Sequence, residues 1–199
     1  ILLCINGTGI LNSLLKHNIM GSNPSEADYG HMDALASKIP AGSEGLVMIP
    51  YGNGAERSLG NRDIGASVHN LSLTTHHTGH LLRAAQEGIV FALASGVEII
   101  RGMGVAVSRV RAGRANMFLS GIFREAFATT TGAVVELYNT DGAQGAARGA
   151  GIGAGVFKDR TEAFAGLVSQ DTITPDDSKK DAYMTAYERW RAALNAELG

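Results

Sequence analysis

The stretch that decides the fold is Gly102–Gly155, GMGVAVSRVRAGRANMFLSGIFREAFATTTGAVVELYNTDGAQGAARGAGIGAG. In it, a β-branched apolar run at residues 105–110 leads into a glycine turn and predicts a strand. Apolar side chains at helical spacing predict a helix from Leu119 to Thr129, and Val134–Leu137 predicts a second strand. A turn and then a helix of almost only Ala and Gly, residues 143–155, complete the stretch. This order predicts a βαβα unit.

In βαβα units, ligands lie outside the carboxyl ends of the strands, where backbone N–H groups and helix N-termini face an anionic group. Here the turn 112–116 follows the first strand, and the turn 139–142 follows the second. The Ala and Gly residues of the last helix allow its backbone to approach a neighbour or a flat ligand closely. We therefore interpret this unit as a nucleotide-binding half-site.

The rest of the chain also alternates between strand and helix patterns. Residues 46–49 form a short continuous apolar run, which is typical of a strand buried on both faces. The other predicted elements are, in chain order, a strand at 1–5, a helix at 10–17, a helix at 26–38 capped by Ser25, an edge strand at 66–71, a long helix at 76–100 capped by Thr75, and polar helices at 159–168 and 178–198 joined by a Thr/Pro/Asp linker. Together they predict an α/β fold with a mixed or mostly parallel sheet and helices on both faces.

Composition narrows the functional classes. The 199 residues, 45% hydrophobic and 18% charged, predict one or two globular domains and exclude a disordered chain. A net charge of -2 removes any general electrostatic case for binding nucleic acid or an anionic membrane. The single cysteine, Cys4, excludes a disulfide framework and fits a reducing cytoplasm. No apolar run reaches the length of about 20 residues that a transmembrane helix needs. The start in an apolar run without Met suggests a piece of a longer protein.

Three blocks of the sequence resemble the signatures of the FGGY-type carbohydrate kinases. Leu46–Arg57, LVMIPYGNGAER, is similar to the family pattern G-L-x-F-x-P-x-L-x-G-E-R. Ala66–Glu87 follows the second signature and departs from it at Asn70, where the family has Gly, and at Gln86, where it usually has an apolar residue. Asp141–Ala147, DGAQGAA, is similar to E-x-x-A-L-G-A-A. The resemblance covers essentially the whole chain and is closest to the xylulokinase branch.

The resemblance implies the actin-like, ribonuclease-H-like fold, in two halves with the active site in the cleft between them. It implies transfer of the γ-phosphoryl group of ATP, with Mg²⁺, to a sugar hydroxyl. Residues 1–199 would be the C-terminal, nucleotide-binding domain, with the N-terminal sugar-binding domain absent. The expected sugar is a ketopentose, D-xylulose, held mainly by that absent half, and a homodimer is a further partner that the resemblance allows. No position matches the family's catalytic aspartate, so no catalytic residue is assigned.

The resemblance also indicates where the nucleotide binds. Many relatives carry a G-G-G-A-x-S loop where this chain has Ala112, Gly113 and Asn116, and the Asn resembles the adenine-contacting Asn of the glycerol kinase branch. These three residues are therefore expected to bind ATP or ADP, with Gly9 and Asn12 as a second adenosine-contacting segment. The alternatives are a left-handed turn with the Asn as an N-cap at the first site, and an ordinary strand-to-helix turn at the second.

The histidines invite a metal interpretation, since side chains four positions apart share a helix face. No further side chain of metal-ligating type is suitably spaced with His76, His77 and His80, so no metal site is expected.

Four further polar residues have structural interpretations beside the functional ones. Glu56 and Arg57 either reach the interdomain cleft or form a surface ion pair. Glu87, inside an apolar helix face, is expected to be a buried and hydrogen-bonded anchor and not a catalytic group. Asp141 is expected to cap the small-residue helix. The alternative is that it holds that helix against the nucleotide.

Two other functional classes compete with the kinase. A non-catalytic actin-like module would bind nucleotide or a partner protein without turning anything over. A dinucleotide-binding oxidoreductase domain is disfavoured, because no G-x-G-x-x-G follows a strand with an acidic residue about 20 residues later.

Overall fold

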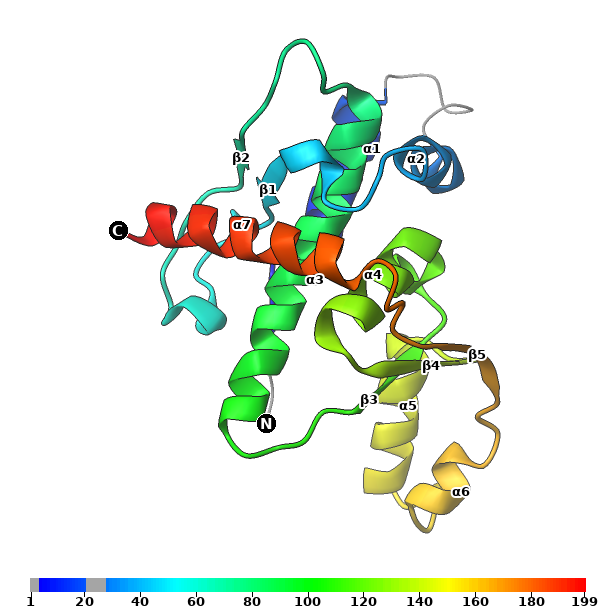
Figure 1. Cartoon of the computed structure of the whole chain (residues 1–199). Coiled ribbons are helices and arrows are strands. Elements are labelled where there is room, and N and C mark those ends of the chain that lie inside the picture. Colours follow the sequence, from blue (N-terminus) through cyan, green and yellow to red (C-terminus); the bar gives the residue numbers. More distant parts are fainter. Residues whose placement is uncertain (1–3, 21–27) are drawn as a thin grey trace.

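The computed structural model describes residues 4–20 and 28–199 of the chain (Figure 1). In chain order its elements are α1 (Thr8–Asn18), α2 (Tyr29–Ala36), the 3₁₀ turn η1 (Ser43–Gly45), β1 (Val47–Ile49), η2 (Arg57–Leu59), β2 (Ser67–His69), α3 (Thr78–Gly102), β3 (Arg109–Gly113), η3 (Asn116–Leu119), α4 (Gly121–Thr131), β4 (Val134–Tyr138), α5 (Gly142–Gly153), α6 (Arg160–Phe164), β5 (Ser169–Ile173) and α7 (Lys180–Leu198).

The predicted βαβα unit is confirmed. β3 and β4 pair in parallel, from Arg109 opposite Val134 to Gly113 opposite Tyr138. α4 connects them and packs on the sheet. Its apolar side chains, Phe123 among them, recur at helical spacing and are buried. The first strand lies later in the sequence than residues 105–110, so the glycine turn is itself the end of the strand.

The third strand of this sheet was not predicted. β5, Ser169–Ile173, pairs antiparallel with β4 along the edge that β3 leaves free, where the sequence indicates only a linker. Its sequence, SQDTI, is polar because the strand is half-exposed at the edge of the sheet, so it carries no apolar alternation. The helix predicted at 159–168 is correspondingly shorter and ends at Phe164.

β1 and β2 form a separate two-stranded antiparallel sheet, with Met48 opposite Val68. Every residue of β1 is buried, as its continuous apolar run predicts, and β2 is the predicted edge strand. The α/β class with a mixed sheet is thus confirmed. The strands of the described residues are divided between two small sheets of two and three strands.

The 25-residue helix α3 runs through the centre of the molecule and connects these two parts (Figure 1). It packs on β1, α2 and α4. Gly88 permits the contact with β1, since a Cβ there would lie 2.1 Å from the carbonyl oxygen of Met48. The helix begins at Thr78 and His77 is its N-cap, so the prediction that Thr75 caps it is wrong.

α7 crosses α3 and closes the core (Figure 1). Its apolar side chains lie on one stripe of the helix, and Tyr183, Tyr187, Trp190 and Leu194 are all buried. The indole Nε1 of Trp190 donates a hydrogen bond to the carbonyl oxygen of Met48, at 3.1 Å, and so ties α7 to β1.

Near the N-terminus the structure tests the predictions only in part. The predicted first helix is confirmed as α1. Of the strand predicted at 1–5, Cys4 and Ile5 are not in a strand and the other residues lie outside the described ones. The cap predicted at Ser25 also lies outside them, and α2 is capped by Asp28, whose carboxylate accepts a hydrogen bond from the N–H of Gly30. Within the described ranges, none of the helices combines the length and the apolar composition that a membrane crossing requires.

Candidate functional site

Two cavities meet where the carboxyl ends of β3 and β4 lie. One, of about 280 Å³, is lined by the end of β3 and the start of α5, including Ala112, Gly113 and Asp141. The other, of about 720 Å³, is lined by α1, α2 and the turn after β3, including Gly9 and Asn12. Asn116 and Met117 line both, so the cavities are neighbours. The structure therefore brings together all five residues that the sequence suggests for the nucleotide: Gly9, Asn12, Ala112, Gly113 and Asn116.

Gly113 is required by a close approach of the chain's own backbone. A Cβ at this position would lie 2.3 Å from the carbonyl oxygen of Thr140 and 3.2 Å from the Cα of Asp141. The φ angle of Gly113 is not in the left-handed region, so Gly113 is not the left-handed residue of the turn that was the alternative for this site. The glycine lets the end of β3 contact the turn that opens α5 and so shapes the smaller cavity.

The left-handed residue of the turn is Asn116, with φ of 52°. Asn tolerates this conformation better than most residues with a side chain. It is the first residue of η3, whose cap is Ala115, so Asn116 is not an N-cap. Its exposed side chain lies at the boundary of the two cavities. A side-chain amide there can both donate and accept hydrogen bonds.

The N-terminus of α5 opens on the smaller cavity, through Asp141 and Gly142. Asp141 is the predicted cap, because its Oδ1 accepts a hydrogen bond from the N–H of Gln144 at 2.8 Å. The remaining N–H groups of the first turn and the helix dipole favour an anionic group at this place. The negative charge of the Asp141 carboxylate reduces that attraction.

Near α1, Glu56 holds the turn that leads into the helix. It is completely buried, so its interpretation as a surface ion pair is wrong. Its Oε1 accepts a hydrogen bond from the N–H of Asn6 at 2.9 Å and fixes the turn that precedes α1 and Gly9. Burial raises the pKa of Glu56, and the backbone N–H groups of Asn6 and Gly7 oppose that rise.

Sequence reasoning missed one group of cavity residues. Gln86, Asp33 and Ser120 line the larger cavity from three different helices or caps. Gln86 is 2% exposed, and its amide bridges the other two side chains at 2.7 Å each. The only sequence signal was that Gln86 stands where the kinase signature usually has an apolar residue.

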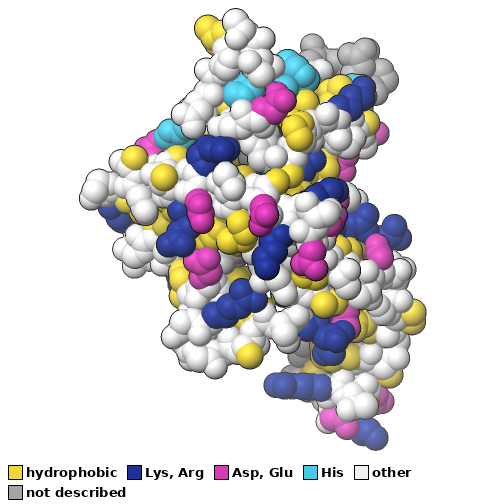
Figure 2. Space-filling view, viewed as in Figure 1, with side chains coloured by type: hydrophobic (Ala, Val, Ile, Leu, Met, Phe, Trp, Pro, Cys, Tyr) yellow, Lys and Arg dark blue, Asp and Glu magenta, His cyan; other side chains and the backbone are white. Residues whose placement is uncertain are grey.

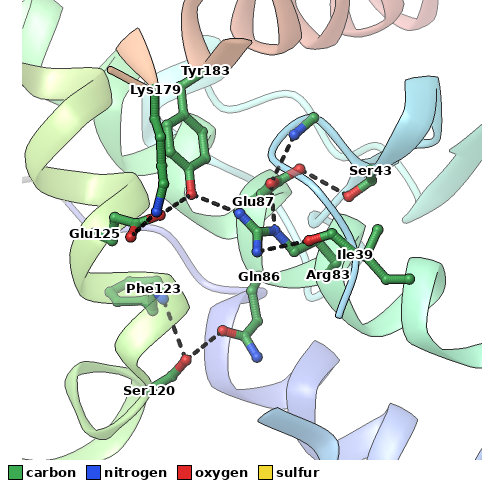
Figure 3. Close-up of polar contacts among 11 residues, drawn as sticks. Ile39, Ser43, Arg83, Gln86, Glu87, Ser120, Phe123, Glu125, Lys179 and Tyr183 are labelled. Atoms are coloured by element: carbon green, nitrogen blue, oxygen red, sulfur yellow. Dashed lines mark hydrogen bonds and ion pairs between the residues drawn. The ribbon is translucent and has the colours of Figure 1, made fainter. Parts of the chain in front are cut away.

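Glu87, the next residue, belongs to a separate buried network (Figure 3). Arg83 Nε donates to Glu87 Oε1 at 2.8 Å, and Gly42 N–H and the Ser43 hydroxyl donate to the same carboxylate. Arg83 also donates to the Tyr183 hydroxyl at 2.7 Å. Burial raises the pKa of Glu87 while these donors oppose the rise. The prediction of a buried, hydrogen-bonded anchor is confirmed.

All three histidines make structural contacts. The Nδ1 atom of His76 accepts a hydrogen bond from the N–H of Ser72 at 3.0 Å. The Nδ1 atom of His77 accepts from the N–H of Gly79 at the start of α3, and the Nδ1 atom of His80 accepts from the N–H of His77. His80 Nε2 lies 2.9 Å from a carboxylate oxygen of Glu44. Across residues 4–20 and 28–199, no three side chains of metal-ligating type gather in one place.

The molecular surface carries both signs of charge. On the face shown in Figure 2, Lys and Arg side chains alternate with Asp and Glu side chains over the middle of the molecule. This distribution agrees with the small net charge and gives that face no basic patch of the kind that binds nucleic acid.

Comparisons with known proteins agree with the motifs. No model of a known protein family matches the chain. Over 205 residues it is 27% identical to the xylulose kinase of Haemophilus influenzae, covering 96% of this chain and 40% of that protein. A stretch of 95 residues is 34% identical to the gluconokinase of Bacillus subtilis, covering 45% of this chain and 18% of that protein. The solved structure of the xylulose kinase of Rhodospirillum rubrum matches with a TM-score of 0.78 and 29% identity, over 94% of this chain and 38% of that one.

The predicted resemblance to the FGGY-type carbohydrate kinases is therefore confirmed, and the fold is their actin-like, ribonuclease-H-like fold. The chain spans about two fifths of the length of the xylulose kinases that it matches.

Proposed function

We propose that this chain is the C-terminal, ATP-binding part of an FGGY-type carbohydrate kinase. Its similarity to about two fifths of each of the two xylulose kinases fits one of the two halves that such a kinase has. The sugar-binding half and the general base would then lie in the rest of the protein. A cytoplasmic location stays a prediction from the single cysteine.

The observation that supports this proposal is the convergence of Gly9, Asn12, Ala112, Gly113 and Asn116 on two neighbouring cavities. The larger cavity has the size of a small-molecule site and would hold the adenosine. The smaller one faces the N-terminus of α5 and would hold phosphate oxygens. Asn116, at the boundary, would hydrogen-bond the base or the ribose.

The chemistry assigned to this chain is positioning. Phosphoryl transfer depends on aligning the γ-phosphoryl group with the acceptor hydroxyl and on stabilising its charge. The cavities would fix the adenosine, and the first turn of α5 would stabilise phosphate charge. Closure of the two halves would expel water from the cleft. Mg²⁺ would neutralise phosphate charge when bound.

The proposed acceptor is D-xylulose, giving xylulose 5-phosphate, since two relatives that match over 96% and 94% of this chain are named xylulose kinases. A gluconokinase also matches, so the choice between these sugars rests on the rest of the protein. The alternative is a non-catalytic actin-like module, which would bind nucleotide in the same cavities without turnover.

Calorimetric titration of the protein with Mg-ADP tests the site, with the variant Asn116→Gly beside it. Glycine keeps the left-handed backbone and removes the amide, so the loss of one hydrogen bond should weaken binding about tenfold. The matched control is Asn70→Gly, because Asn70 is also exposed and left-handed, with φ of 60°, and lines neither cavity.

The control should bind as the wild type does. A folded wild-type protein that shows no saturable binding of Mg-ADP would overturn the proposed nucleotide site. ATP consumption with D-xylulose or gluconate as acceptor then separates a kinase from the non-catalytic module.

A further inference from the structure

Gln86 lies at the back of the larger cavity, between α2 and the start of α4. It projects from α3, is 2% exposed, and shares the lining of that cavity with Asp33 and Ser120. Figure 3 shows its amide directed at Ser120. A buried amide in place of an apolar side chain must find hydrogen-bond partners to offset its desolvation. Its two partners belong to two different walls of the cavity.

The hydrogen bonds that connect Ser120, Gln86 and Asp33 can have only one arrangement of donors and acceptors. Ser120 Oγ accepts from the N–H of Phe123, as the cap of α4, and so gives its single proton to Gln86 Oε1 at 2.7 Å. This bond fixes the amide and turns its Nε2 toward Asp33 Oδ1, also at 2.7 Å. The carboxylate only accepts, so the chain Ser120 to Gln86 to Asp33 is complete.

The Ser120 end of the chain bears on the turn that carries Asn116. The N–H of Ser120 donates to the carbonyl oxygen of Met117 at 3.0 Å and closes η3. Anchoring Ser120 therefore anchors the turn between the two cavities. The Asp33 end anchors α2, which forms the opposite wall of the larger cavity.

We infer that Gln86 is a positioning residue for the nucleotide: it clamps α2 to the start of α4 and so sets the shape of the adenosine cavity. This inference rests on the proposed function. Gln86 acts through Asp33 and Ser120 and needs no contact with the ligand. Nucleotide affinity should accordingly follow the match of donors and acceptors in the clamp, whichever residues supply them.

An exchange of groups across the clamp tests this. Gln86→Glu keeps the acceptor for Ser120 but places a carboxylate 2.7 Å from that of Asp33, and should weaken Mg-ADP binding about tenfold or more. Asp33→Asn alone should have an effect below about threefold, because the new amide can turn its oxygen to Gln86. In the double variant an amide donor at position 33 faces a carboxylate acceptor at position 86, so affinity should return to within about threefold of wild type.

A second measurement separates positioning from general damage. Hydrogen exchange of the backbone amides should speed up in α2 and the first turn of α4 in Gln86→Glu, and return toward the wild-type rates in the double variant. Ser43→Ala is the control, since Ser43 is a fully buried polar residue that loses one hydrogen bond to Glu87 and lines neither cavity. It should leave the exchange of both segments and the affinity for Mg-ADP unchanged.

The outcomes distinguish the two proposals. If Gln86→Glu binds Mg-ADP as tightly as the wild type does, the clamp is overturned and the nucleotide site remains supported. The same holds if the double variant is folded but does not recover affinity. A folded wild type that does not bind Mg-ADP overturns both.

Discussion

At the scale of single residues, the turn after β3 assigns different tasks to its glycine and its asparagine. Gly113 permits contact between the end of β3 and the turn at Thr140, whereas Asn116 adopts the left-handed conformation and presents an amide to the cavities. The sequence indicated both residues as one nucleotide loop. It could not separate their tasks, because the partner of Gly113, Thr140, lies 27 positions away in the chain.

Gly113→Ala should destabilise the protein. The added methyl group would lie 2.3 Å from the Thr140 carbonyl oxygen, so β3 or the turn must move, at a cost of about 1–3 kcal/mol in the free energy of unfolding. Gly145→Ala is the matched control, because a Cβ inside α5 meets no atom within 4 Å and should stabilise the helix by about 0.5–1 kcal/mol. Urea unfolding of both variants measures the difference, and equal effects of the two substitutions would contradict the close contact.

At the scale of elements, α3 is organised by its buried polar residues as much as by its apolar ones. Arg83 and Glu87 connect it to the turn at Gly42 and to α7, while Gln86 connects it to α2 and α4. An apolar stripe on a helix fixes which face is buried, but leaves rotation and sliding weakly determined. Directional hydrogen bonds remove that freedom, so these residues fix how the neighbouring elements dock.

Glu87→Gln should be strongly destabilising. It leaves the Arg83 guanidinium buried without its charged partner, and breaking a buried ion pair on one side costs about 3–5 kcal/mol. Glu98→Gln is the control on the same helix, since Glu98 pairs with Arg191 at 3.7 Å on the surface and should change stability by less than about 1 kcal/mol. Thermal and urea unfolding measure both, and a loss for Glu87→Gln no larger than for the control would show that the buried pair does not hold the helix.

At the scale of the whole molecule, burial of carboxyl groups sets how stability depends on pH. The pKa of Glu56 is raised in the folded protein above its ordinary value of 4.5, chiefly by burial. Between these two pKa values the folded state holds more protons than the unfolded state. The contribution of Glu56 to stability is therefore fully present below the unfolded pKa and is lost as the pH rises through the folded pKa.

Glu56→Gln removes this titration and keeps an acceptor for the N–H of Asn6. Its free energy of unfolding, relative to wild type, should rise as the pH increases from 4.5, the ordinary pKa of a glutamate, through the raised pKa of the folded state. Glu188→Gln, at an exposed position, is the control and should keep a constant offset. Urea unfolding at several pH values measures both, and a constant offset for Glu56→Gln would show that the carboxyl is not desolvated as the structure indicates.

The sequence by itself determined the local architecture. The order of β3, α4, β4 and α5, the buried strand β1 and the apolar stripe of α7 follow from hydrophobic periodicity, which acts within one element. The family motifs added the five residues that converge on the cavities. These features depend on neighbours in the chain, and a single sequence records them directly.

Only the tertiary structure decided how distant segments meet. β5 carries no apolar alternation, and its pairing with β4 depends on backbone hydrogen bonds to a strand that is distant in the sequence. The burial of Glu56 and the clamp at Gln86 depend on partners 50, 53 and 34 positions away in the chain. A polar residue in a sequence does not show whether its hydrogen-bond partner is water or a buried group of the protein, because the residue type is the same in both cases. Hydrogen bonds between segments that the fold brings together are therefore evident only in the tertiary structure.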